Sequence, residues 1–251
     1  MKHFLVALHF LTIIRLPGAP QASPESIGES ATLFPIVGLL LGLALVSCDW
    51  LLEACVPPAI LSIALVVLII LMTRAFHLDG LADTFDGLGA KDGKQEALRA
   101  MRDSSTGVFG MLAVVIVLSL KFKCLELIRE LRVPALLLSP VLGRWAMLVL
   151  AYNSTSPAEG LGRILVEHMH RRHFILGSLF TSILSVMIAG ISGLWILLSA
   201  FLLTWIMRRY FHRRIGGVTG DTCGAAGEIT ESLILTIFAL IEWNKSGTSY
   251  R

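Results

Sequence analysis

The chain has few charged residues for its length. Asp, Glu, Lys and Arg make up 16% of its 251 residues, whereas soluble globular proteins carry about 25%. Hydrophobic residues account for 55%, and the mean hydropathy is +0.76. The formal net charge is only +3, and no block of Lys and Arg is interleaved with aromatic residues, which argues against a nucleic-acid partner. This composition predicts an integral membrane protein whose partner is the lipid bilayer.

The sequence shows no metal-binding cysteine pairs, and its N-terminus does not have the pattern expected of a secretory signal. None of the four cysteines belongs to a C-x-x-C pair, so neither a zinc site nor a disulfide framework is indicated. The short apolar stretch at the N-terminus is followed by Arg15-Leu16-Pro17 rather than by a small-residue cleavage site. We expect the first 16 residues to form a retained amphipathic helix, followed by a non-helical connector containing Pro17, Pro20 and Pro24.

Long apolar runs predict an all-α fold: a single-domain (1–251), polytopic helical bundle with about six to seven transmembrane helices. A span takes about 20 residues. Phe174–Met207 is too long for one span, and Gly190 and Gly193 predict a hairpin turn within it. The other expected spans are Ala31–Trp50, Ala59–Phe76, Gly107–Leu120 (with an extension through Lys121–Arg132 as one longer helix), Val133–Tyr152 and Ala225–Trp243.

Three polar blocks separate these runs, at residues 77–106, 153–173 and 208–224. Basic residues flank the hairpin at both of its ends, which places those ends in the cytoplasm by the positive-inside rule. Arg74 and the basic residues of the first block agree, so all three blocks are expected on one membrane face. One group of cations falls on the opposite side: Lys121, Lys123, Arg129 and Arg132.

Three acids follow an apolar run closely. Asp79, Asp83 and Asp86 have spacings of four and three residues, which place them on one face of a helix. Carboxylates this close repel each other unless a cation neutralises them, and hard oxygen ligands suit Mg²⁺, Mn²⁺ or Ca²⁺. The pattern therefore predicts a divalent metal site, with a solvated acidic helix end as the alternative.

Part of this segment resembles a known signature. Asp83-x-x-Asp86-Gly87-x-x-Ala90-Lys91 is similar to the opening of the CDP-alcohol phosphotransferase signature, D-x-x-D-G-x-x-A-R. Lys91 replaces the arginine, and the second half of the signature does not follow. Asp103 is the nearest later acid with basic neighbours. The resemblance carries over for the metal ligands and not for the general base.

A wider resemblance covers nearly the whole chain. The phrases at 76–87 (FHLDGLADTFDG), 102–110 (RDSSTGVFG), 143–145 (GRW) and 216–225 (GGVTGDTCGA) resemble the cobalamin synthase family, the adenosylcobinamide-GDP ribazoletransferases. The resemblance implies an inner-membrane enzyme that joins adenosylcobinamide-GDP to α-ribazole or its 5′-phosphate, releases GMP and needs Mg²⁺.

The chemistry of such a reaction suggests roles for individual residues, and for the glycine-rich segment with Asp221 the suggestion depends on the resemblance. Asp79, Asp83 and Asp86 would hold the metal, and Asp103 and Asp221 are the candidate catalytic acids. Asp221 could equally complete the metal site. The candidate substrate-binding residues are His77, Lys91, Arg99, Arg102, Arg144, Gly216, Gly217, Thr219 and Gly220.

Each of these assignments has a simpler alternative. Lys91, Arg99 and Arg102 could contact lipid headgroups, and Arg144, which lies inside a span, could pair with an acid. The glycine-rich segment could be an ordinary turn. For the chain as a whole, the alternatives are a phospholipid-forming CDP-alcohol phosphotransferase and a transporter. The sequence leaves open a homo-oligomer or a complex with other late enzymes of cobalamin synthesis.

Overall fold

The computed structural model is built from helices. It describes residues 2–16, 22–91 and 93–247, and within them the chain forms twelve α-helices, one short 3₁₀ turn and no strand. Six of the described helices are long and apolar enough to cross a membrane, and a bent helix pair would make a seventh span. The structure therefore confirms the predicted polytopic helical bundle.

The helices of the first half include the amphipathic helix expected at the N-terminus. They are α1 (Lys2–Leu11), α2 (Pro24–Ser30), the 3₁₀ turn η1 (Ala31–Leu33), α3 (Phe34–Leu52), α4 (Pro58–Thr73), α5 (Phe76–Gly89) and α6 (Lys94–Ala100). Of the predicted connector, Pro24 is the first residue of α2, where its fixed φ suits a helix start. Pro17 and Pro20 lie outside the described residues.

The second half contains the remaining long helices. They are α7 (Val108–Leu127), α8 (Arg132–Ala151), α9 (Leu161–His168), α10 (Arg171–Ala189), α11 (Ile191–Ile215) and α12 (Gly220–Gly247). Gly190, at φ 58°, ends α10 and precedes α11, which confirms the predicted hairpin. The third polar block is shorter than expected, because its first residues, up to Ile215, extend α11.

Two predicted helix boundaries are wrong. The span expected to reach Phe76 ends at Thr73, because Arg74 and Ala75 adopt left-handed backbone angles (φ 57° and 56°). After this corner α5 points 89° away from α4. The helix expected to continue through Arg132 ends at Leu127, and a short connection leads into α8.

The core of the bundle is α8, which packs against α3, α10, α11 and α12. Gly38 and Gly42 on α3 form a small-xxx-small pair that faces this helix. A Cβ at Gly38 would lie 2.5 Å from the carbonyl oxygen of Pro140, and one at Gly42 would lie 2.9 Å from that of Leu136. Membrane helices approach closely at such residues because dispersion contacts then replace a missing hydrophobic driving force.

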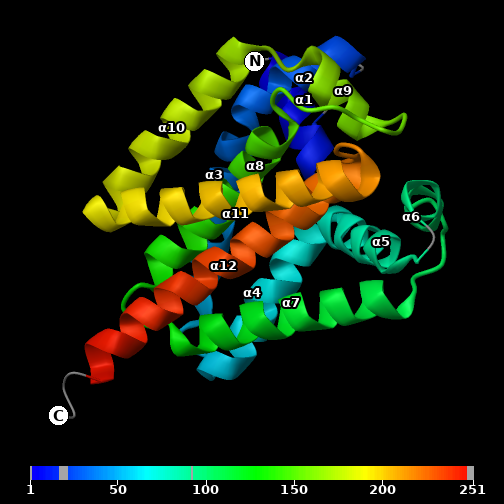
Figure 1. Ribbon diagram of the computed structural model, residues 1–251. Coiled ribbons are helices and arrows are strands. Elements are labelled where there is room, and N and C mark those ends of the chain that lie inside the picture. The colour runs from blue at the N-terminus through cyan, green and yellow to red at the C-terminus, as the bar shows by residue number, and fades with distance from the viewer. Residues whose placement is uncertain (1, 17–21, 92, 248–251) are drawn as a thin grey trace.

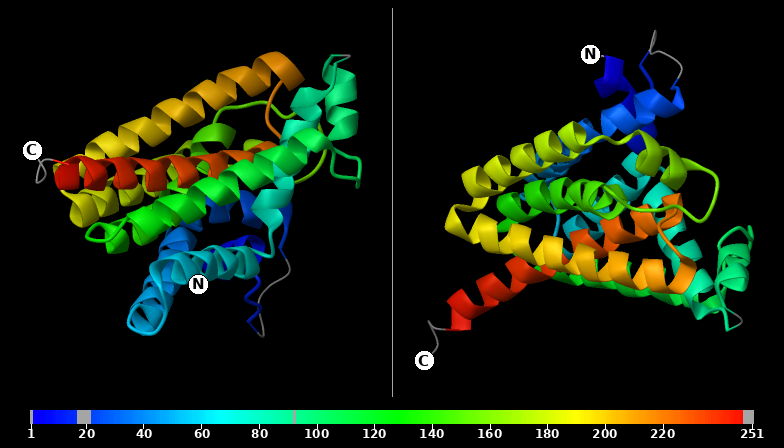
Figure 2. Two further views of the ribbon diagram at one scale, coloured as in Figure 1. Left: turned by 90° about the horizontal axis from the view of Figure 1, so that it is seen from below. Right: turned by 45° about the horizontal axis from the view of Figure 1, so that its top comes forward.

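The polar blocks gather at one end of the bundle. Figures 1 and 2 show α5 and α6 beside the end of α11 and the starts of α7 and α12. The backbone N–H of Val218 donates to the carbonyl of Thr155 at 2.8 Å, and Arg214 donates to the carbonyl of Ala90. These contacts join the third block to the second and to the first, so the expected convergence is present in the fold.

The cations that disagreed with the predicted orientation are partly accounted for by burial. Lys121 is 3% exposed and pairs with Glu228 and Glu231. Arg132 pairs with Asp49 at 2.6 Å. A cation neutralised inside the protein does not contribute to the loop charge that orients a membrane protein, which leaves only Lys123 and Arg129 in disagreement.

Candidate active site

The three predicted metal-binding acids lie on α5, outside the six candidate spans. Asp79 is exposed, and Asp83 and Asp86 are half-buried. Burial of Asp83, together with the charges of Asp79, Asp221 and Asp86, raises its pKa to about 7. The carboxylates of Asp79, Asp86 and Asp221 are therefore close enough to Asp83 to interact with it electrostatically.

Asp221 joins this group because α12 crosses α5 at Gly80. A Cβ at Gly80 would lie 2.9 Å from both the Cα and the carbonyl oxygen of Asp221. Any larger side chain would push the two helices apart. The hydroxyl of Thr219 lies 3.3 Å from the Asp221 carboxylate and donates to it. The structure thus brings together acids that are well over a hundred positions apart in the chain.

Asp86 also connects α5 to the start of α7. Its two carboxylate oxygens accept the backbone N–H groups of Gly107 at 2.7 Å and of Gly110 at 2.8 Å. Gly107 is the N-cap residue of α7 and Gly110 lies in its first turn, where helix N–H groups lack intrahelical partners. Each oxygen retains a free lone pair, so Asp86 can hold α7 in place and still face a cation.

The donor set suits magnesium. All four groups are carboxylates, which are the hard oxygen ligands that Mg²⁺ prefers. Burial and, after it, the neighbouring carboxylates raise the pKa of Asp83, and a bound divalent cation would relieve the repulsion between these charges. Within residues 2–16, 22–91 and 93–247, no three His, Cys, Asp or Glu side chains are already arranged as a metal site. Side-chain rotation would be needed to bring the carboxylates around one ion.

Asp103, the other candidate catalytic acid, lies on an exposed loop. Its carboxylate accepts the backbone N–H of Ser105 at 2.9 Å and the Ser105 hydroxyl at 2.6 Å. These hydrogen bonds lower the pKa of Asp103, because they stabilise its charged form. The loop continues to Gly107, and through it Asp103 is linked to Asp86.

The candidate basic residues of the first block are on the surface of the protein. Lys91, Arg99 and Arg102 are exposed, and Arg99 makes an ion pair with Glu96 at 4.0 Å. Lys94, which was not among the predicted residues, packs against Gly216. The Lys94 ammonium therefore lies beside the glycine-rich turn of the third block.

The glycine-rich segment is a turn that leads into α12. Gly216 and Gly217 adopt φ angles of 83° and 154°. Thr219 and Thr222 exchange hydrogen bonds: Thr219 N–H donates to Thr222 Oγ1 at 2.8 Å, and Thr222 N–H donates to Thr219 Oγ1 at 3.2 Å. This reciprocal pattern satisfies amides at the start of the helix. Thr219 therefore caps α12, whose first residue is Gly220, and the cap places Asp221 in the first turn.

Arg144 and His77 lie in a buried charge network formed by α5, α7, α8 and α12. Arg144 is 1% exposed, donates to Glu231 and has its Nη2 3.3 Å from Nδ1 of His77. Lys121 Nζ lies 2.6 Å from Glu228 and 2.5 Å from Glu231. We call these five residues the buried network. Both His77 and Arg144 are closed to a substrate in this conformation, and the acid pairing considered for Arg144 is present.

Comparison with known proteins identifies the family. The model of the cobalamin-5-phosphate synthase family matches residues 3–239. The chain belongs to this family. Relatives named adenosylcobinamide-GDP ribazoletransferase are 34% identical in Geotalea daltonii (96% of this chain, 98% of the relative), 38% in Syntrophobacter fumaroxidans (95% and 98%) and 39% in Pseudomonas syringae pv. syringae (96% and 100%). No solved structure matches the chain.

Sequence reasoning missed part of the polar interior of this cobalamin-5-phosphate synthase family member. Lys121 was counted only as a topology signal, and neither Glu228 nor Glu231 was among the candidate site residues. A usable signal existed: each is a charged residue within an apolar helix, which is costly in a membrane unless it is paired. With Arg144, the two cations and two carboxylates balance, although the sequence does not show which pairs form.

Proposed function

We propose that this chain transfers the adenosylcobinamide phosphate of adenosylcobinamide-GDP to α-ribazole or α-ribazole 5′-phosphate, with release of GMP. The proposal draws its substrates from the name that the relatives carry. One structural observation supports it above the others: α12 crosses α5 at Gly80, which brings Asp221 next to the helix that carries Asp79, Asp83 and Asp86. A reaction at a pyrophosphate needs such a site for charge control.

The reaction exchanges one oxygen for another at phosphorus. A ribose hydroxyl of the acceptor forms a new O–P bond at the phosphorus next to the cobinamide, and the O–P bond to the GMP unit breaks. GMP leaves with the bonding electron pair, and the hydroxyl proton passes to a carboxylate or to water. Most of the acceleration in such transfers comes from positioning and from stabilising the developing charge.

We assign a role in this reaction to each group of residues from its location in the fold. Asp79, Asp83 and Asp86 would hold Mg²⁺, which when bound neutralises the pyrophosphate charge. Asp221 lies across the helix crossing from these acids and would orient the acceptor hydroxyl and take its proton. Lys94 and the exposed cations of the first block can attract the anionic donor.

The location of the site supports a cytoplasmic reaction at the inner membrane. The polar blocks form one end of a bundle with six candidate spans, and their basic residues favour the cytoplasmic side. Adenosylcobinamide-GDP is large and amphipathic, and holding the site at the membrane face would suit a substrate that partitions there.

The two alternative functions are less well supported. The family match over residues 3–239 and relatives with a single common name do not favour a phospholipid-forming CDP-alcohol phosphotransferase. They also do not favour a transporter. Asp79, Asp83 and Asp86 lie on α5, outside the six candidate spans.

Purified protein in phospholipid vesicles tests the proposal. On addition of adenosylcobinamide-GDP, Mg²⁺ and either acceptor, we expect equal molar release of GMP and appearance of the joined corrinoid. CDP-diacylglycerol with an alcohol should give no CMP release. If GMP is not released under any of these conditions, the proposed function is wrong.

A further inference from the structure

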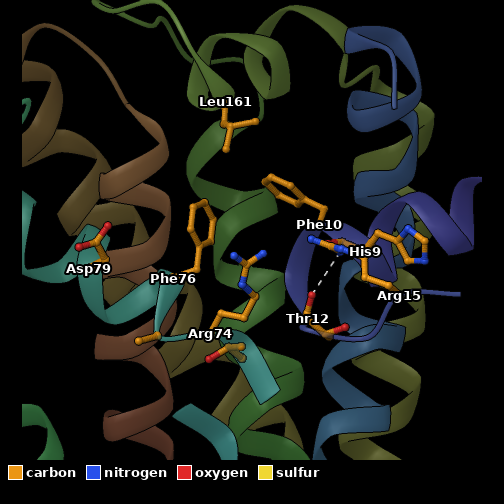
Figure 3. A pocket seen from close by; sticks show the side chains of 10 residues that line it. His9, Phe10, Thr12, Arg15, Arg74, Phe76, Asp79 and Leu161 are labelled. Carbon is orange, nitrogen blue, oxygen red and sulfur yellow. Dashed lines mark hydrogen bonds between the residues drawn. The ribbon is translucent and has the colours of Figure 1, made fainter. Parts of the chain in front are cut away.

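An open pocket of about 630 Å³ lies beside the acid helix. Pockets of roughly 300–1,000 Å³ are the usual size for small-molecule sites. Its walls come from the end of α1, the corner between α4 and α5, and the first residue of α9. The residues that matter here are Phe10, Arg15, Arg74, Phe76, Asp79 and Leu161 (Figure 3).

Two guanidinium groups face this pocket without a carboxylate partner. Among the described residues, neither Arg15 nor Arg74 makes an ion pair within 4.0 Å. Arg15 folds back over the end of α1, where it donates to the carbonyls of His9 and Thr12. Five N–H donors are present on a guanidinium, so Arg15 keeps donors for a ligand.

The backbone at the helix corner directs Arg74 into the pocket. Arg74 and Ala75 both have left-handed φ angles, a conformation that costs a non-glycine residue about 1 kcal/mol or more and concentrates at functional sites. Figure 3 shows the Arg74 guanidinium pointing into the space between Phe76 and the end of α1. The corner thus presents a cation to the cavity instead of to the lipid.

The opposite walls are apolar and aromatic. The rings of Phe10 and Phe76 have centroids 6.0 Å apart and planes at 71°, and Leu161 completes this side. Such walls fit a flat heteroaromatic group through stacking and edge contacts. Asp79 is also a lining residue, so one edge of the pocket is shared with the four-carboxylate site.

We propose that this pocket binds the phosphate and the aromatic base of a nucleotide substrate, with Arg15 and Arg74 on the phosphate and Phe10 and Phe76 against the base. The assignment rests on the proposed function for the nature of the nucleotides. Two sources share this chemistry: the 5′-phosphate of α-ribazole 5′-phosphate, and the GMP unit of the donor. In either case Asp79, which lines the pocket and also belongs to the acid group, would set the bound nucleotide next to the proposed metal site.

Arg74→Gln and Arg15→Gln test the proposal, with Arg163→Gln as a matched control. Arg163 is on α9 and pairs only with Glu159 and Glu167 in the part of the chain described, so its variant removes a guanidinium from outside the pocket. A charge-assisted hydrogen bond to phosphate is worth about 1.5–3 kcal/mol, or roughly ten- to hundredfold in affinity. We expect losses of that size for the pocket variants and no change for the control.

Kinetic measurements in vesicles of neutral phosphatidylcholine separate the two sources. If the acceptor phosphate binds here, kcat/KM falls for α-ribazole 5′-phosphate and is unchanged for α-ribazole. If the GMP unit binds here, the KM for adenosylcobinamide-GDP rises with both acceptors and inhibition by GMP weakens. Either result supports the proposal and identifies the ligand.

Two results would overturn it. One is that both pocket variants match wild type in all of these measurements while wild type turns over. The other is that their defects appear only in vesicles containing anionic lipid, which would make the arginines headgroup contacts. Equilibrium dialysis with labelled GMP and labelled α-ribazole 5′-phosphate gives a readout that needs no turnover. It tests the pocket even if wild type releases no GMP, and unchanged binding of both nucleotides to the folded variants would count against the proposal.

Discussion

The ammonium of Lys121 on α7 lies 2.6 Å from a carboxylate oxygen of Glu228 on α12, with both side chains less than 10% exposed. Glu231, one turn further along α12, accepts from Lys121 and from Arg144. The buried network thereby ties α7, α8 and α12 together, and Arg144 extends it to His77 on α5. The helix that carries the predicted metal ligands is attached to the membrane core through charged groups.

Removal of one cation from the network should destabilise the protein strongly. Lys121→Met leaves Glu228 and Glu231 with only Arg144 for compensation, and breaking a buried pair costs about 3–5 kcal/mol. Unfolding in detergent, followed by circular dichroism, measures the loss. Lys123→Met is the matched control, because Lys123 is an exposed partner of Glu126, and should change stability by about 0.5 kcal/mol or less. Equal stability of the two variants would show that the network contributes little.

Activity should require a divalent metal and Asp83. Chelation should abolish GMP release, and Mg²⁺ should restore it. Asp83→Asn removes a charge from the centre of the four carboxylates and should lower kcat by roughly a hundredfold or more, with the fold retained. Glu96→Gln removes an exposed carboxylate on the neighbouring α6 and should leave GMP release intact. Near-normal turnover of Asp83→Asn at saturating Mg²⁺ would rule out the metal assignment.

Asp221→Asn distinguishes acceptor positioning from metal binding. If Asp221 orients the acceptor, the variant should lose GMP release but keep Mg²⁺-dependent binding of adenosylcobinamide-GDP. If Asp221 is a metal ligand, both should fall together. Binding by equilibrium dialysis and GMP release, measured on the same preparation, give the answer. Unchanged GMP release would remove Asp221 from the active site.

The orientation of the protein in the membrane can be tested by cysteine labelling, with the native Cys55 as an internal reference. Cys55 is exposed and lies just before the start of α4. The other end of α4 leads into the corner next to the acids. The 16 residues of α4 make the helix about 24 Å long at 1.5 Å per residue, so Cys55 and the acids lie near opposite ends of it. Impermeant thiol reagents should reach Cys55 from the periplasm. In a Cys55→Ser background, cysteines introduced at Ser104 and Ser156 should react only from the cytoplasm. Periplasmic labelling of either position would contradict the proposed orientation.

Much of the fold followed from the sequence because apolar length and helix-breaking residues are local properties. The Gly190 hairpin and the helical spacing of Asp79, Asp83 and Asp86 are examples. The corner at Arg74 and Ala75 could not be predicted, because neither residue favours a left-handed backbone and only tertiary packing holds them there. The sequence therefore placed a straight span where the chain turns.

The sequence predicted which acids form the candidate site better than it predicted the contacts between the buried charged residues. Asp221 was expected near the other acids through the family resemblance, and the contact at Gly80 explains how it reaches them. The pairing of Lys121 with Glu228 and Glu231 depends on how α7 and α12 are rotated about their axes. Hydropathy alone does not fix that rotation, and the sequence offered several acids for each buried cation.

The dependence of both the acid group and the buried network on α12 has a consequence for biosynthesis. Until the last helix leaves the ribosome and enters the bilayer, Lys121 and Arg144 have none of the carboxylates that neutralise them. Unpaired cations in the hydrocarbon region are costly, so α7 and α8 should stay associated with the insertion machinery or with water until synthesis nears completion. A chain arrested before Glu228 would be inactive and also poorly accommodated by the membrane, which would mark incomplete copies for proteolysis.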